Sequence, residues 1–108
     1  MADPIRPELL IQRRHGDAPP DRAHLQRRME RQGLRPYSWS DAPGTVYAPH
    51  RHAYTKHLVV ARGSIRFVLD ETGERIDLTA GDAMVLPAGT LHSAVSGPAG
   101  VTCLEAEG

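Results

Sequence analysis

The sequence predicts an all-β domain, a sandwich or a barrel, and three observations favour this class. Short apolar segments are separated by turn residues every eight to twelve residues or so, which is typical of antiparallel sandwiches and barrels. Proline (9) and glycine (10) are frequent and divide the chain into such segments. Apolar and polar residues alternate in several of them, as at Ile65, Phe67 and Leu69. The 108 residues suffice for one domain with one modest core.

The first twenty residues predict an irregular arm, because four prolines interrupt them: Pro4, Pro7, Pro19 and Pro20. Within the arm only residues 9–11 (Leu-Leu-Ile) are consecutively apolar. This tripeptide fits either a short edge strand or a contact with another subunit, and the sequence leaves both open.

A single helix is predicted from Asp21 to Gln32. Asp21 is a good N-cap residue and Gly33 a good residue for the position after the helix. Leu25 and Met29 lie four residues apart and form a narrow apolar stripe. We therefore expect residues 1–35 to be an arm and a surface helix that packs on a barrel formed by residues 36–108.

After Pro36 the pattern becomes strand-like. The expected strands are centred on residues 37–39, 45–48, 57–61, 65–69, 76–79, 83–86, 91–95 and 101–104. The expected turns or loops are residues 41–44, 62–64, 71–74, 80–82 and 97–100, all rich in Gly, Pro, Asp or Ser.

Composition excludes several classes of function. Thirteen basic and thirteen acidic residues give a formal net charge of zero, so no electrostatic nucleic-acid partner is expected. No apolar run approaches the roughly 18 residues of a membrane helix, so no membrane association is expected. The polar start lacks the apolar core of a signal peptide, and a single cysteine cannot form an intramolecular disulfide. These features predict a cytoplasmic protein.

Two short histidine motifs are the most informative feature of the chain. His50 and His52 are one residue apart, so on an extended strand they point to the same face. His92 follows Pro87-Ala88-Gly89 and belongs to another expected strand. Neutral imidazole is a common metal ligand, and three histidines with open positions form a typical catalytic metal arrangement.

These motifs resemble those of the cupin family. The first family motif is Gly, five residues, His-x-His, three or four residues, Glu, six residues and Gly. Here Gly44, His50, His52 and Gly63 match it, and Lys56 stands at the position of the Glu. The second motif is Gly, five residues, Pro-x-Gly, two residues, His, three residues and Asn. Here Gly81, Pro87, Gly89 and His92 match it, and Ser96 stands at the position of the Asn. The match covers residues 44–96 approximately.

The resemblance implies a double-stranded β-helix (jelly-roll) barrel, to which this chain adds the N-terminal arm and one short helix. It implies that His50, His52 and His92 hold a divalent transition metal ion. Because no carboxylate joins the set, zinc, nickel, iron or copper is favoured over magnesium or calcium. The implied partner is a small polar or anionic organic molecule.

The family contains several classes of function, and the sequence leaves three of them open. The first is a metal-dependent enzyme of dioxygenase, isomerase or lyase type, in which the ion acts as a Lewis acid. The second is a non-catalytic domain that binds or senses a sugar or an organic acid in the same pocket. The third is a structural cupin without metal.

Lys56 has three possible places: pointing into the site, extending to the barrel mouth, or lying on the surface. An inward lysine would serve as a base, a nucleophile towards carbonyls, or an anchor for an anion. Regular alternation places residues 50, 52, 54 and 56 on one face and His57 on the other. A β-bulge would reverse this parity and make His57 the fourth ligand.

Tyr54 is a second candidate for handling protons. Tyr47, Tyr54 and Trp39 fit either the lining of a ligand pocket or barrel core and dimer contacts. Cys103 is expected to be an inert, buried thiol. Because small barrels cover or pair their exposed sheet edges, and the arm carries an apolar tripeptide, we expect a homodimer.

Overall fold

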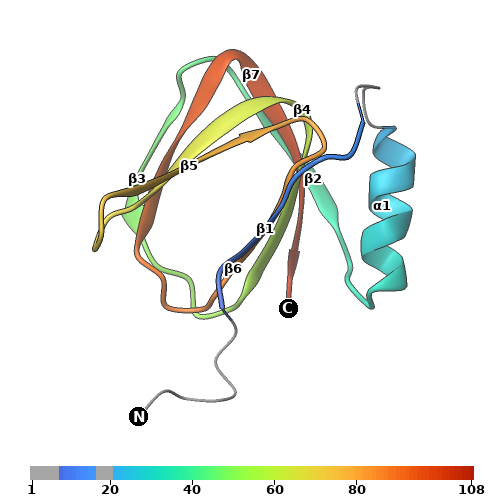
Figure 1. Cartoon of the computed structure of the whole chain (residues 1–108), viewed down its shortest axis with the longest axis horizontal. Coiled ribbons are helices and arrows are strands. Elements are labelled where there is room, and N and C mark those ends of the chain that lie inside the picture. Colours follow the sequence, from blue (N-terminus) through green and yellow to red (C-terminus); the bar gives the residue numbers. More distant parts are fainter. Residues whose placement is uncertain (1–7, 17–20) are drawn as a thin grey trace.

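The computed structural model describes residues 8–16 and 21–108. Within them the elements follow the order β1 (Leu10–Gln12), α1 (Arg22–Arg31), β2 (Tyr37–Asp41), β3 (Val46–His50), β4 (Lys56–Leu69), β5 (Glu74–Thr79), β6 (Ala83–Leu86) and β7 (His92–Glu107). The strands wind into a jelly-roll β-barrel with the helix on its outside (Figure 1). The predicted all-β class is confirmed.

A long two-stranded ribbon of β4 and β7 organises the barrel. The two strands pair antiparallel from Lys56 with Glu107 to Leu69 with His92. The first part of β4 also pairs with β6, and its second part with β5. The last part of β7 also pairs with β2, and its first part with β3. The ribbon is therefore shared by two sets of strands, and its bending closes them around a common interior.

Two predicted turns are wrong. Residues 62–64 lie inside β4 and residues 97–100 lie inside β7, with the register of the two strands shifting beside them. Gly63 has a φ of +77°, and a Cβ at this position would collide with the carbonyl oxygen of Gly100. The glycines therefore serve close backbone approach and bulges within continuous strands rather than chain reversals.

The bulges also decide which residues of β4 face the core. Leu58 and Val60 belong to the interior cluster before the register shift, and Ile65 and Phe67 belong to it after the shift. The inward positions change from even to odd because an extra residue reverses strand parity. The interior cluster is completed by residues of β5, β6 and β7: Ile76, Leu78, Met84, Leu86, Ala94, Val101 and Cys103.

Helix α1 covers the outer face of the β4–β7 ribbon. The Asp21 side chain accepts a hydrogen bond from the Ala23 backbone N–H at 3.0 Å, which caps the helix as predicted. Leu25 and Met29 are buried against the outward-facing residues Val59, Leu104 and Ala106. The helix thus buries the apolar stripe seen in the sequence. No helix within the described residues is long and apolar enough to cross a membrane.

The arm contributes an edge strand. Strand β1 pairs antiparallel with β6, with Leu10 opposite Val85. Of the two alternatives for residues 9–11, the structure therefore shows the edge strand. The prolines expected to interrupt the arm lie outside the described residues. The division into residues 1–35 and 36–108 stays a prediction.

Asp82 ties the arm to the barrel. Its carboxylate, 5% exposed as a residue, accepts hydrogen bonds from the backbone N–H groups of Arg14 (2.9 Å) and Thr79 (2.9 Å) and from the Arg13 guanidinium (3.1 Å). Burial acts to raise the pKa of Asp82, but these hydrogen bonds outweigh it and lower the pKa below its usual value.

Candidate metal centre

The three motif histidines meet inside the barrel. His50 ends β3, His52 follows two residues later, and His92 begins β7. One ring nitrogen from each histidine lies within 4.8 Å of the others. His50 and His92 are paired across the two strands, and their ring centroids are 4.3 Å apart. The predicted trio is therefore brought together, although it comes from segments forty residues apart.

A bulge in β3 turns His50 towards this cluster. Tyr47 pairs with Ala94 and His50 with His92, so β3 has one residue more than β7 between these pairs. The extra residue reverses the parity of the strand, and Tyr47 and His50 both line the same interior cavity. Pro49 lies in this irregular stretch, where its missing N–H is tolerated. His52 lies beyond the strand, so strand alternation alone does not place it.

Backbone carbonyls fix the rings of two histidines. Nδ1 of His50 lies 2.6 Å from the carbonyl oxygen of Ala48, and Nδ1 of His92 lies 2.8 Å from that of Thr90. A carbonyl oxygen only accepts hydrogen bonds, so each Nδ1 carries the proton and donates it. The neutral ring then presents the lone pair of Nε2, as metal-binding histidines commonly do.

The free nitrogens are buried and lack partners. Nε2 of His52 and Nε2 of His92 find no hydrogen-bond partner among the described residues. His92 is 0% exposed, and burial lowers its pKa to about 4. Burial, aided by the nearby positive charge of Lys56, also lowers the pKa of His52. Neutral imidazoles with unused lone pairs suit a metal ion, because buried polar atoms are otherwise nearly always satisfied.

Lys56 lies on the inner face of β4. The residue is 8% exposed, and its Nζ lies 3.5 Å from Oε1 of Glu105. It lines the same cavity as His50 and His92. Of the three possible places for Lys56, the structure shows the inward one, beside the trio and paired with a carboxylate. Its catalytic role stays a prediction.

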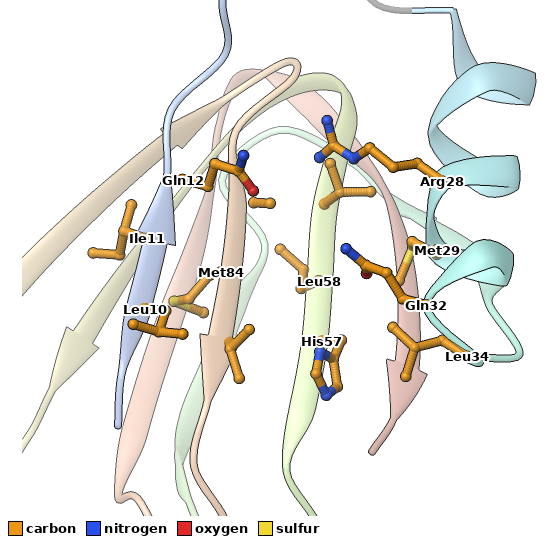
Figure 2. Close-up of a pocket in the computed structure, with 13 residues that line it drawn as sticks. Leu10, Ile11, Gln12, Arg28, Met29, Gln32, Leu34, His57, Leu58 and Met84 are labelled. Atoms are coloured by element: carbon orange, nitrogen blue, oxygen red, sulfur yellow. The ribbon is translucent and has the colours of Figure 1, made fainter. Parts of the chain in front are cut away.

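His57 takes the opposite face of β4. It lines a groove of about 400 Å³ between β1 and α1, over the outer side of the barrel, together with Met29, Leu34 and Leu10 (Figure 2). Strand parity at residues 56 and 57 is therefore regular. The alternative of His57 as a fourth ligand does not fit this placement.

Glu105 holds the inner side of β2, β4 and β7 together. Besides the ion pair with Lys56, it accepts hydrogen bonds from the Tyr37 hydroxyl at 2.6 Å and from Nε1 of Trp39 at 3.1 Å. The hydrogen bond to Glu105 and burial raise the pKa of Tyr37. The sequence analysis did not single out Glu105. Its alternation with Val101 and Cys103, both buried, is the signal that predicts its inward position.

A small chamber lies beside the trio. This chamber has a volume of about 40 Å³, and its accessible walls are mainly apolar. The residues that line it are Trp39, Tyr47, His50, Lys56, Ile65, Phe67, His92 and Ala94. The hydroxyl of Tyr47 is buried without a hydrogen-bond partner in the described part of the chain. Tyr47 and Trp39 therefore line this chamber and also pack against the core, where their rings meet edge to face with centroids 5.9 Å apart.

The structure also shows the contacts of three other residues considered in the sequence, Tyr54, Ser96 and Cys103. Tyr54 lies beside His52, with ring centroids 4.8 Å apart, and its role in proton transfer stays a prediction. Ser96 accepts a hydrogen bond from the Thr45 N–H and donates one to the Ala42 carbonyl, so it fixes the 42–45 turn. Cys103 is fully buried as expected, and burial raises its pKa to about 12. Its inertness stays a prediction.

The family model described as the cupin domain matches residues 37–103, more than half of the chain. This chain belongs to the cupin family. The matched region contains all three histidines and the Lys56 position, and it ends before Glu105. No curated protein sequence matches the chain.

Several solved structures share the fold. KdgF from a Halomonas species is 29% identical over 68% of this chain and 67% of its own, with a TM-score of 0.58. The polyketide cyclase RemF from Streptomyces resistomycificus is 25% identical over 68% of this chain and 54% of its own, with a TM-score of 0.59. A cupin superfamily protein from Desulfitobacterium hafniense DCB-2 is 14% identical over 98% of this chain and 82% of its own, with a TM-score of 0.58, and supports the fold alone.

Proposed function

We propose that this cupin binds one divalent transition metal ion through His50, His52 and His92 and acts on a small polar or anionic organic molecule. Two observations carry the proposal. The Nε2 atoms of His52 and His92 are buried without a hydrogen-bond partner among the described residues. One ring nitrogen from each of the three histidines lies within 4.8 Å of the others. The all-nitrogen donor set suits zinc, nickel, iron or copper.

Different residues of the chain would then bind the ion, transfer a proton and bind an anionic group. The three histidines would hold the ion, which supplies Lewis acidity towards a substrate oxygen when bound. Tyr54, beside His52, is the candidate for moving a proton, and Lys56, beside His50 and His92, is the candidate for meeting an anionic group. An enzyme of dioxygenase, isomerase or lyase type is consistent with this set. Similarity to the polyketide cyclase RemF supports a catalytic role.

Non-catalytic binding of a sugar or organic acid by the same site is the second candidate. The observation that favours it is the ion pair of Lys56 with Glu105. A lysine whose charge is paired and buried is a poor base or nucleophile, because those roles need the neutral amine. The same lysine remains a good donor towards a bound anion.

Metal content tests the first half of the proposal. Purified protein should carry close to one equivalent of a transition metal by elemental analysis. The single variants His50→Ala, His52→Ala and His92→Ala should each lower the occupancy, because two nitrogen ligands rarely retain a divalent ion well. His57→Ala is the matched control and should keep the wild-type content. A triple alanine variant with wild-type metal content would disprove the ligand assignment.

Turnover separates the two candidates. The metal-loaded protein should be assayed against small carbonyl compounds, sugars and organic acids. Turnover that disappears in His92→Ala favours the enzyme, whereas saturable binding without turnover favours the binding domain. Action in the cytoplasm, expected from the single cysteine, is part of the proposal.

A further inference from the structure

His52 lies in a loop, unlike the other two candidate ligands. Strand β3 ends at His50 and β4 begins at Lys56, so residues 51–55 connect the two strands. His50 and His92 are paired across β3 and β7, and each ring Nδ1 donates to a backbone carbonyl. The strand ladders therefore hold two of the three histidines, and the position of His52 depends on contacts of its loop.

Two hydrogen bonds with Gly89 hold this loop beside the segment that leads to His92. The Gly89 backbone N–H donates to the carbonyl oxygen of His52 at 2.8 Å. The Arg51 guanidinium donates to the carbonyl oxygen of Gly89 at 3.0 Å. Gly89 thus bonds to two consecutive residues of the loop and lies three residues before His92. The two bonds join the segments that carry the second and third histidines.

The hairpin between β4 and β5 holds Arg51 from the other side. Nη1 of Arg51 lies 2.7 Å from Oε1 of Glu71, which belongs to this hairpin. The hairpin is also bonded to the start of β7, because the backbone N–H of Asp70 donates to the carbonyl oxygen of Leu91 at 3.2 Å. Arg51 therefore connects the His52 loop to two segments that are themselves fixed beside His92.

We propose that Arg51 is a positioning residue of the metal centre, which orders the His52 loop through Gly89 and Glu71 before the ion binds. The inference rests on the proposed function, because it takes His52 as a ligand. A loop held in its binding conformation raises affinity, since the entropy of ordering it is not lost on binding. The charge of Arg51 alone would repel a dication, and the pairing with Glu71 offsets this repulsion.

Zinc titration of the metal-free protein, with a competing chelator, measures the effect. Arg51→Met removes both contacts of the guanidinium and should raise the Kd for zinc about tenfold, the lower end of the roughly 10–100-fold range typical of residues that orient metal ligands. Arg51→Lys keeps the charge and the N–H donors and should recover part of the loss.

Arg66→Met is the matched control. The Arg66–Asp77 pair has the same 2.7 Å distance as the Arg51–Glu71 pair and nearly the same exposure, 47% and 62% against 51% and 62%. It joins β4 to β5, away from the His52 loop in the sequence and in the strand pairing. This variant should bind zinc as the wild type does. Both exposed pairs contribute little to global stability, so both variants should fold.

A double-mutant cycle separates positioning of His52 from a general loss of structure. In the His52→Ala background, Arg51→Met should have no further effect on zinc affinity, because the ligand that Arg51 positions is gone. The titration of this background is carried to the higher zinc concentrations that it requires. An equal effect of Arg51→Met in both backgrounds overturns the inference, and so does an unchanged Kd in Arg51→Met itself.

Hydrogen exchange in the metal-free protein distinguishes failure of this inference from failure of the metal proposal. Arg51→Met should speed exchange of the Gly89 N–H several-fold, whereas the N–H of Val60, a buried residue bonded to the Asp82 carbonyl, should keep its wild-type rate. If the wild type binds no zinc, the proposed function fails, and faster Gly89 exchange still supports ordering of the loop by Arg51. Unchanged Gly89 exchange overturns that ordering, whatever the zinc affinity.

Discussion

Lys56 and Glu105 are a buried pair of opposite charges, and each depends on the other. Their side chains are 10% and 6% exposed. Removing one partner of such a pair leaves an uncompensated charge in the interior, which typically costs about 3–5 kcal/mol. We predict a loss of this size in the free energy of unfolding for Lys56→Met, measured by urea denaturation.

The double variant Lys56→Met/Glu105→Gln checks the cause of that loss. Both charges are removed and glutamine still accepts from Trp39, so most of the lost stability should return. Arg66→Met breaks an exposed ion pair with Asp77 and should change stability little. If Lys56→Met is as stable as Arg66→Met, the pair is not buried in solution.

Motif spacing predicted the residues of the candidate centre well, because the three histidines and Lys56 each follow from a local pattern. The expectation that residues 50, 52, 54 and 56 alternate along one extended strand was wrong, because β3 ends at His50 and β4 begins at Lys56. Within β4, Lys56 and His57 nevertheless take opposite faces. Glu105 was missed because its contacts are with residues distant in the sequence. The pairing of β7 with β2 and β4 places Glu105 opposite Tyr37 and beside Lys56, and both residues precede it by more than forty positions. The position of Tyr47 and His50 at one interior cavity likewise depends on a bulge in β3, which a local sequence pattern does not predict.

At the scale of elements, Asp82 connects the arm to the turn between β5 and β6. Asp82→Asn replaces a carboxylate that accepts from Arg13, Arg14 and Thr79. Hydrogen bonds to charged groups contribute about 1.5–3 kcal/mol. We predict a loss of about 2 kcal/mol in unfolding free energy at neutral pH, measured by urea denaturation. Asp77→Asn, on the exposed face of β5, is the control and should change stability little.

The Asp82 contribution should also depend on pH in a defined direction. Its pKa in the folded protein is lower than its ordinary value of 3.8, so the unfolded chain binds the proton more readily. The stabilisation is therefore complete above about pH 4 to 5 and is lost as the pH falls below 3.8. The stability difference between the wild type and Asp82→Asn should shrink over that range. A constant difference down to pH 3 would contradict this assignment.

Turn residues explain why the strand boundaries were harder to predict than the strands themselves. Gly63 and Gly100 have the composition of turns, and a local pattern does not tell a chain reversal from a bulge. The two glycines face one another across β4 and β7, a relation that exists only after the ribbon has formed. The helix was predictable since its cap, its apolar stripe and its terminating glycine are all local.

For the whole molecule, we propose a homodimer in which a second copy covers β1. Leu10 and Ile11 are 59% and 37% exposed on this edge strand. They border the apolar groove next to α1 (Figure 2). Light scattering at micromolar concentration should give the mass of two chains, and Leu10→Glu should reduce it to one, since a charge on an edge strand opposes pairing.

Val46→Glu provides the control for this prediction. Val46 is 75% exposed, but it lies on β3 and not beside the groove. The variant should keep the wild-type mass. A monomeric wild type, or dissociation of both variants alike, would show that β1 is not the interface.

The long β4–β7 ribbon has a consequence for how the proposed metal ion would be acquired. His92 reaches His50 only when strands distant in the sequence have paired, so the three nitrogens do not form a site in the open chain. An ion that binds only the closed barrel stabilises the whole molecule by mass action, by about 2.7 kcal/mol at a hundredfold excess over its dissociation constant. Such an ion does not template the barrel, in contrast to small zinc domains that fold around their metal. If the proposed ion binds, its loading would therefore follow folding, and a cell starved of the metal would accumulate folded, empty barrels that remain competent to be filled.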